Sequence, residues 1–142
     1  MLKKLQKPTV LYSNYKNEAL ENKSVFIIDT IGLLTKIYKY ADIAYIGGGM
    51  GSSGLHNTLE AATFGVPIVI GKNYQKFPEA KAMLTKGGLF SIDSGASLQE
   101  TLDALVKNPE KRKALGQTNK EYIKNNKGAS ELVMAEITKL YS

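Results

Sequence analysis

The chain has 142 residues, of which 43% are hydrophobic and 23% charged, and its formal net charge is +6. This length and composition are typical of one soluble globular domain with a substantial core. The absence of cysteine and the single histidine, His56, exclude a disulfide framework and a thiolate or multi-histidine metal site, so we expect no metal. No apolar run approaches the roughly 18 residues of a membrane span. The positive charge is not accompanied by a nucleic-acid-binding motif, so we expect no nucleic-acid partner.

Short apolar runs alternate with helical patterns along the chain. We expect strands at residues 9–12, 24–29, 43–46, 67–70 and 89–92. We expect helices at residues 31–40, 57–64, 77–86, 97–106, 109–125 and 129–141, with Ser97 capping the fourth of them. Strands separated by helices of about ten residues favour an α/β fold with a doubly wound parallel sheet covered on both faces. The prediction is a single domain over residues 1–142.

A glycine-rich segment, residues 47–54, leads from an expected strand directly into an expected helix. Glycines let the backbone approach a ligand closely, and N–H groups before a helix point at phosphate. Within this segment Gly49-x-Gly51-x-x-Gly54 matches the dinucleotide-binding pattern. That pattern also requires an acidic residue after the next strand, near Gly71, and none is present, so NAD or FAD is not favoured. The segment predicts an anion-binding loop.

Polar side chains follow the glycine segment at the start of the expected helix. Asn57 and Glu60 have the spacing of a helix-capping pair, which needs no ligand. The same two side chains would also project at the mouth of the loop, where a sugar or nucleoside hydroxyl could bind them. His56 either donates a hydrogen bond to a phosphate or carboxylate, or packs under the loop.

Two other strand ends carry candidate residues. Asp29 or Thr30 could cap the helix expected at residues 31–40, and the helix amides near Gly32 could supply a second anion contact. The residues that could border the same crevice after the next strand are Lys72, Tyr74, Lys76 and Glu79. Because ligands bind beyond the carboxyl ends of parallel strands, we expect the three loops to converge on one crevice.

Four motifs occur in a fixed order between about Val25 and Ile92. They are Asp-Thr-Ile-Gly-Leu-Leu at residues 29–34, Gly47-Gly48, Gly-Leu-His-Asn-Thr-Leu-Glu at residues 54–60, and Gly65-Val66-Pro67. In this order and spacing the sequence resembles the C-terminal half of the bacterial 3-deoxy-D-manno-octulosonic acid (Kdo) transferases.

The resemblance implies the Rossmann-like C-terminal half of a two-domain GT-B glycosyltransferase, the half that binds the donor CMP-Kdo. Its implied donor-binding residues are Gly32, Gly48, Gly49, His56, Asn57 and Glu60. The catalytic base, the acceptor site and a membrane anchor would belong to an N-terminal domain that this chain lacks. We therefore expect a soluble fragment without catalytic residues of its own, inactive in isolation.

The full enzyme implied by the resemblance transfers Kdo from CMP-Kdo to the lipid A precursor in lipopolysaccharide biosynthesis. It would act at the cytoplasmic face of the inner membrane, with no cofactor besides the donor substrate. Two alternatives remain open from the sequence. One is the donor domain of another GT-B transferase or epimerase that uses a UDP-sugar, and the other is a non-catalytic nucleotide-binding module.

Overall fold

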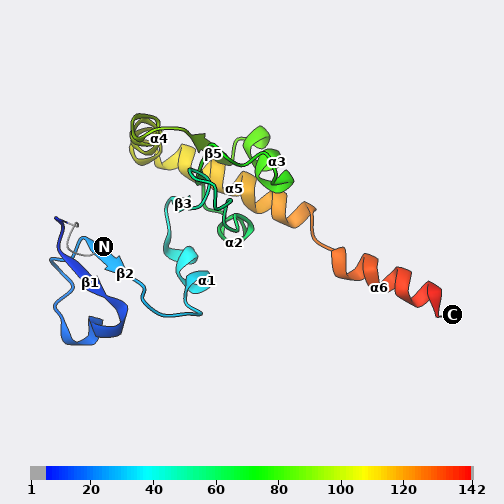
Figure 1. Cartoon of the computed structure of the whole chain (residues 1–142), viewed down its shortest axis with the longest axis horizontal. Coiled ribbons are helices and arrows are strands. Elements are labelled where there is room, and N and C mark those ends of the chain that lie inside the picture. The colour runs from blue at the N-terminus through cyan, green and yellow to red at the C-terminus, as the bar shows by residue number, and fades with distance from the viewer. Residues whose placement is uncertain (1–5, 142) are drawn as a thin grey trace. The chain divides into compact units, whose positions relative to one another are not determined.

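The computed structural model describes residues 6–141 of the chain. The chain divides into two compact units, the first ending at Lys39 and the second beginning at Tyr40 (Figure 1). Each unit contains its own parallel β-sheet, with two strands in the first and three in the second.

The first unit is built on two parallel strands, β1 (Thr9–Leu11) and β2 (Val25–Ile27). A 3-10 helix, η2 (Tyr12–Asn17), follows β1. Its Tyr12 and Tyr15 rings stack with centroids 5.1 Å apart, and both meet the Phe26 ring edge-on. These three rings tie η2 to β2. The short helix α1 (Leu34–Ile37) and the 3-10 turn η3 (Tyr38–Tyr40) follow.

The second unit contains a parallel sheet with the strand order β3-β4-β5. Its strands are β3 (Ala44–Ile46), β4 (Ile68–Gly71) and β5 (Leu89–Ile92), and the connecting helices are α2 (Leu59–Thr63) and α3 (Pro78–Lys86). Every residue of the central strand β4 is buried, as expected for a parallel strand covered on both faces. This burial on both faces explains why the sequence of β4 is a continuous apolar run.

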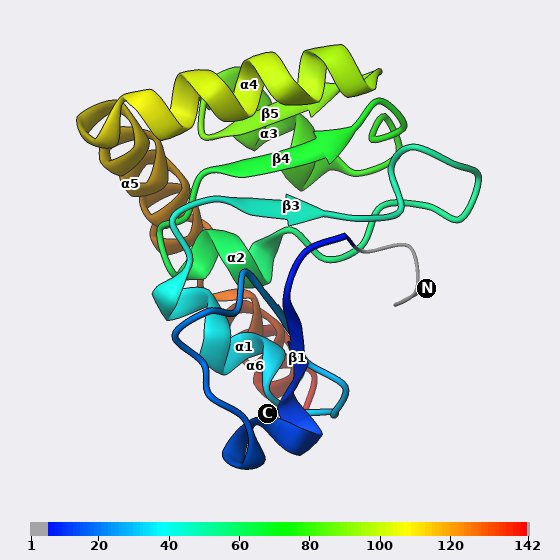
Figure 2. The same cartoon turned by 90° about the vertical axis from the view of Figure 1, so that its left-hand side faces the viewer.

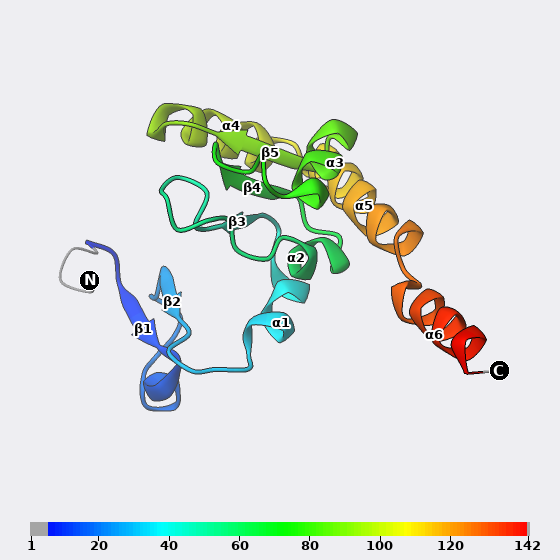
Figure 3. The ribbon, with the colours of Figure 1, turned by 45° about the vertical axis from the view of Figure 1, so that its right-hand side comes forward.

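Helices cover both faces of the three-stranded sheet. On one face Val69 of β4 packs with Ile92 and with Leu105 of helix α4 (Gly95–Lys107). Successive strand residues alternate between faces, so Ile68 and Ile70 lie on the opposite side. Right-handed crossovers bring α2 and α3, with their buried alanines, to that opposite side. Figures 2 and 3 show α4 lying along β5, apart from α2 and α3.

Helix α5 (Pro109–Asn125) packs against α2, α3 and α4 and reaches the residues just before β4 and β5. The buried Asn119 amide donates to Val66 O at 2.8 Å and to Gly88 O at 2.7 Å, just before those two strands. Gly116 allows the close approach, because a Cβ there would lie 1.9 Å from Gly65 O. Helix α5 thus lies near the amino ends of the strands, whereas the glycine loop lies at their carboxyl ends.

Helix α6 (Ala129–Leu140) follows α5 after Gly128, whose φ of 108° breaks the helix. All residues of α6 are exposed, including Leu132, Val133 and Met134. Across residues 6–141, none of the helices has both the length and the apolar character that a membrane crossing requires.

The predicted α/β fold with helices on both faces of a parallel sheet is confirmed, and most element boundaries agree within two residues. Two helix starts differ by more than this. Ser94, not Ser97, caps α4; Ser97 is the third residue of the helix and completes the capping box with Ser94. The helix expected at residues 31–40 is reduced to α1 and η3, because Gly32 has a φ of +88°, which an α-helix cannot contain.

Candidate functional site

The glycine loop, residues 47–54, folds back on itself beyond the carboxyl end of β3. The His56 N–H donates to Gly47 O at 3.1 Å and closes the loop. Gly48 has a φ of +90°, and a Cβ on it would lie 1.9 Å from Gly54 O. Glycine is therefore required at position 48 both for its backbone angle and for the close approach.

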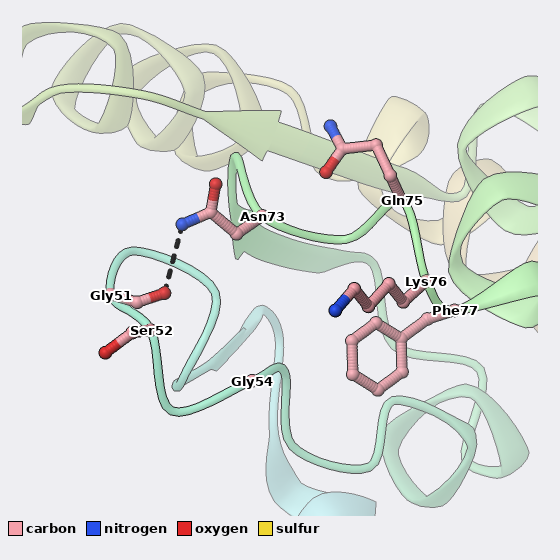
Figure 4. A pocket seen from close by; sticks show the side chains of 7 residues that line it. All are labelled: Gly51, Ser52, Gly54, Asn73, Gln75, Lys76 and Phe77. Atoms are coloured by element: carbon pink, nitrogen blue, oxygen red, sulfur yellow. Dashed lines mark hydrogen bonds between the residues drawn. The ribbon is translucent and has the colours of Figure 1, made fainter.

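A second loop, residues 71–77, lies directly against the glycine loop. A Cβ on Gly71 would lie 2.3 Å from the carbonyl carbon of Gly49, so the two backbones touch. Asn73 joins them through two hydrogen bonds: its backbone N–H donates to Gly49 O at 2.8 Å and its side-chain amide donates to Gly51 O at 3.0 Å. Figure 4 shows the side-chain bond between the loops.

The two loops enclose a pocket of about 370 Å³. Its lining residues are Gly51, Ser52, Gly54, Asn73, Gln75, Lys76 and Phe77 (Figure 4). This volume falls within the range of small-ligand sites, and the lining combines polar side chains and backbone with the Phe77 ring. The arrangement suits a small polar ligand with one flat or apolar part.

Asn57 and Glu60 are brought together at the start of α2. The Asn57 side-chain amide donates to the Glu60 carboxylate at 3.1 Å, and the Asn57 carbonyl oxygen accepts from Leu59 N–H at 3.0 Å. The helix begins at Leu59, two residues later than expected, with Thr58 as its boundary residue. Asn57 thus caps a backbone amide, while Glu60 holds the Asn57 side chain instead of a backbone N–H. A helix of five residues has only a small dipole. The backbone N–H groups of the glycine loop are therefore the main groups at this site that could bind an anion.

The His56 side chain lies against the glycine loop and is also exposed. Its ring is close to Gly48, since a Cβ there would come within 3.0 Å of the imidazole Cδ2. This contact fits the packing alternative. Because the residue is exposed, the donor role also remains open, and the role of His56 as a ligand contact stays a prediction.

The expectation that Asp29 or Thr30 caps a helix is wrong. The Asp29 carboxylate instead accepts two hydrogen bonds from Ser13, from its N–H at 2.9 Å and its hydroxyl at 2.6 Å. These bonds hold the pKa of Asp29 below its usual value. Gly32 lies in the same first unit, and its place in a common crevice with the glycine loop stays a prediction.

Of the predicted site residues, Gly48, Gly49, His56, Asn57 and Glu60 all lie in the second unit, in or directly after the glycine loop. Of the residues expected to border the crevice after β4, Lys76 lines the pocket, whereas Lys72, Tyr74 and Glu79 do not. Asn73, Gln75 and Phe77 also line the pocket and were not predicted from the sequence. Their only signal is that they follow Gly71 in the loop beyond a buried strand.

One further carboxylate lies at the carboxyl end of a strand. Asp93 follows β5, and hydrogen bonds from Ser97 and Ser94, together with the charge of Lys72, keep its pKa below the usual value. Within residues 6–141, no three His, Cys, Asp or Glu side chains are grouped closely enough to hold a metal ion.

Comparison with known proteins places this fold and loop in a family. The family model described as glycosyl transferases group 1 matches residues 9–122. The chain belongs to this family. Its match covers both units, from the first strand nearly to the end of α5.

Within the glycosyl transferases group 1, this chain is similar to proteins named 3-deoxy-D-manno-octulosonic acid transferase, which confirms the resemblance found in the motifs. It is 34% identical to the one from Haemophilus influenzae over 116 residues, which is 80% of this chain and 27% of that protein. It is 30% identical to the one from Chlamydophila psittaci over 128 residues, covering 88% of this chain and 29% of that protein. The chain therefore spans less than a third of the length of these relatives.

A solved structure of the same fold is the C-terminal CMP-Kdo binding domain of WaaA from Acinetobacter baumannii. The match has a TM-score of 0.74 at 20% sequence identity and covers 85% of this chain and 63% of that one. It confirms the predicted fold, the C-terminal half of a GT-B glycosyltransferase.

Proposed function

We propose that this chain is the donor-binding part of a Kdo transferase and that it binds CMP-Kdo. The observation that carries the proposal is the Asn57–Glu60 pair, held by a 3.1 Å hydrogen bond next to a glycine loop. The similarity to Kdo transferases and to a domain named for CMP-Kdo binding supports it.

The donor-binding roles divide according to chemistry. The Glu60 carboxylate is a hydrogen-bond acceptor suited to the hydroxyls of a ribose, and Asn57 holds it in place. Gly48 and Gly49 keep the loop backbone free of side chains, so that its N–H groups can reach a phosphate. In this proposal His56 adds a hydrogen bond to the donor, and Gly32 is a further donor-binding residue, contributed by the first unit.

The reaction we propose for the full-length protein is the transfer of Kdo to a hydroxyl of the lipid A precursor, in lipopolysaccharide biosynthesis. The bond between the anomeric carbon of Kdo and the CMP phosphate oxygen breaks, and the acceptor oxygen forms the new bond. CMP departs with the electron pair, and a base outside this chain takes the acceptor proton. The loop N–H groups stabilise the charge that develops on the departing phosphate.

Location and ligands follow from the same proposal. The full-length enzyme would meet its lipid acceptor at the cytoplasmic face of the inner membrane. The donor is the only small molecule that the proposal requires, with neither cofactor nor metal assigned to this chain. The UDP-sugar alternative would use the same loop with a different nucleotide, and a comparison of CMP with UDP separates the two.

The substitution Glu60→Ala tests the proposal. It removes one charge-assisted hydrogen bond to the ribose, which contributes about 1.5–3 kcal/mol, so the affinity for CMP should fall roughly 10- to 100-fold. Isothermal titration calorimetry measures the affinity. Thermal unfolding should change only slightly, because the one bond that is lost within the protein, from Asn57, is exposed.

The matched control is Glu121→Ala. Glu121 accepts a hydrogen bond from the Gln117 side chain at 3.0 Å on the exposed surface of α5, so the change removes a similar amide–carboxylate pair far from the loop in sequence. CMP affinity should be that of the original chain. A Glu60→Ala protein that binds CMP as well as the Glu121→Ala protein would refute the proposed role.

A further inference from the structure

The pocket between the glycine loop and residues 73–77 contains a single charged side chain. Of its seven lining residues, only Lys76 has a charged side chain, and no carboxylate lines the pocket. Figure 4 shows the Lys76 ammonium directed into the space between the two loops, with its stem beside the Phe77 ring. Throughout residues 6–141, Lys76 is joined to no carboxylate by an ion pair. The pocket therefore has one uncompensated positive charge.

The opposite wall of the pocket offers backbone donors. In the part of the chain that the structure describes, the N–H groups of residues 51–54 donate to no other protein group. The Asn73 clamp holds this segment in place through Gly51 O at 3.0 Å. Gly51 and Ser52 line the pocket across from Lys76 (Figure 4), and backbone N–H groups without an acceptor of their own can bind a phosphate or carboxylate together with a cation.

Lys72 belongs to the same loop but has a different environment. Its charge acts on Asp93, whose pKa it helps to lower, and it does not line the pocket. The two lysines are four residues apart in the sequence, and both are exposed. Lys72 is therefore partly balanced by a carboxylate, whereas Lys76 is not.

We propose that Lys76 and the N–H groups of residues 51–54 form an anion subsite that takes a phosphate or carboxylate group of the ligand. This inference rests on the proposed function, because CMP-Kdo carries both groups: a phosphate in its nucleotide and a carboxylate in its sugar. Lys76 binds the anion as a point charge, and Asn73 is a positioning residue that holds the loop opposite to it. The Phe77 ring supports the lysine stem.

The test compares Lys76→Gln with Lys72→Gln, since each removes one positive charge from the same loop. Binding of CMP, cytidine and free Kdo is measured by NMR titration of the labelled chain at low and high salt. Lys76→Gln should weaken the binding of the anionic probe about three- to ten-fold at low salt, with a smaller difference at high salt. Lys72→Gln should change it little. Cytidine, which has no phosphate, should bind both variants equally.

The comparison of CMP with free Kdo identifies which anionic group of the ligand occupies the subsite. A loss for CMP and not for free Kdo assigns the subsite to the phosphate, and the reverse assigns it to the carboxylate. Equal losses in the two lysine variants would overturn the proposal, because they would indicate a general effect of charge. An unchanged affinity of Lys76→Gln for every probe would also overturn it.

Inorganic phosphate separates this inference from the proposed function. If the original chain fails to bind CMP and Kdo, but phosphate shifts the amide signals of residues 51–54 and Lys76→Gln abolishes the shift, the anion subsite stands and the proposed function fails. If CMP binds but does not depend on Lys76, the proposed function stands and the subsite fails. If neither CMP nor phosphate binds, both are refuted.

Discussion

Asp29 and Ser13 form a contact between side chains that are 16 residues apart in the sequence. Removing the Ser13 hydroxyl by Ser13→Ala should raise the pKa of Asp29 toward its usual value, because the hydroxyl donates the 2.6 Å bond that favours the ionised form. A pKa that is lowered in the folded state stabilises the fold above the pKa of the unfolded chain. That stabilisation disappears as the pH falls through the folded-state pKa. The variant should therefore lose less stability on acidification.

NMR titration of the side-chain carboxyl carbon measures this pKa directly. Ser24→Ala is the control, because Ser24 is exposed in the same unit and its hydroxyl has no part in the Asp29 contact. The same Asp29 titration curve in the Ser13→Ala and Ser24→Ala proteins would contradict the assignment of the pKa shift to Ser13.

Local spacing predicted some side-chain contacts and missed others. Asn57 and Glu60 are three residues apart, so their meeting at the start of a helix could be predicted from spacing alone. The partner of Asp29 could not, since Ser13 reaches it only through the pairing of β1 with β2. The clamp by Asn73 was missed for the same reason: its acceptors, Gly49 and Gly51, precede it by more than twenty residues.

Helix α5 depends on a glycine at its contact with the turn before β4. Gly116→Ala would place a Cβ 1.9 Å from Gly65 O, so backbone must move. We expect a loss of roughly 1–3 kcal/mol in the free energy of unfolding, from overpacking. This is opposite in sign to the gain of about 1 kcal/mol that alanine normally gives in a helix. Urea denaturation followed by circular dichroism measures the difference.

Gly95→Ala is the matched control in a helix that lacks such a contact. A Cβ on Gly95 meets nothing within 4 Å at the start of α4, so this variant should be as stable as the original chain or slightly more stable. Equal stabilities of the Gly116→Ala and Gly95→Ala proteins would show that α5 does not depend on the close approach.

Elements were predictable where one local signal dominated. The apolar runs of β4 and β5 and the proline at the start of α5 marked their positions. The start of α4 could not be predicted, because Ser94 and Ser97 both take part in its capping box. The sequence alone does not show which of the two is the N-cap residue. The helix expected at residues 31–40 begins only at Leu34, because Gly32 lies inside the expected range and its left-handed backbone excludes a helix.

At the scale of the whole molecule, the pairing of the strands could not be predicted from sequence patterns. An apolar run indicates that a strand is buried but does not identify its neighbours. The structure pairs β1 with β2 in the first unit and places β3, β4 and β5 in a separate sheet in the second. The family motifs were more informative than the periodicity, because they specify a complete fold. The match over residues 9–122 and the TM-score of 0.74 confirm that fold.

The central claim is that the second unit recognises a cytidine nucleotide through the glycine loop and the Asn57–Glu60 pair. A two-dimensional NMR titration of the labelled chain with CMP, and with UDP as the comparison, tests it most directly. We predict that CMP shifts the amide signals of residues 47–54, 57 and 60 and that UDP does not. Equal shifts with UDP, or CMP shifts that avoid these residues, would contradict the assignment of this chain to CMP-Kdo.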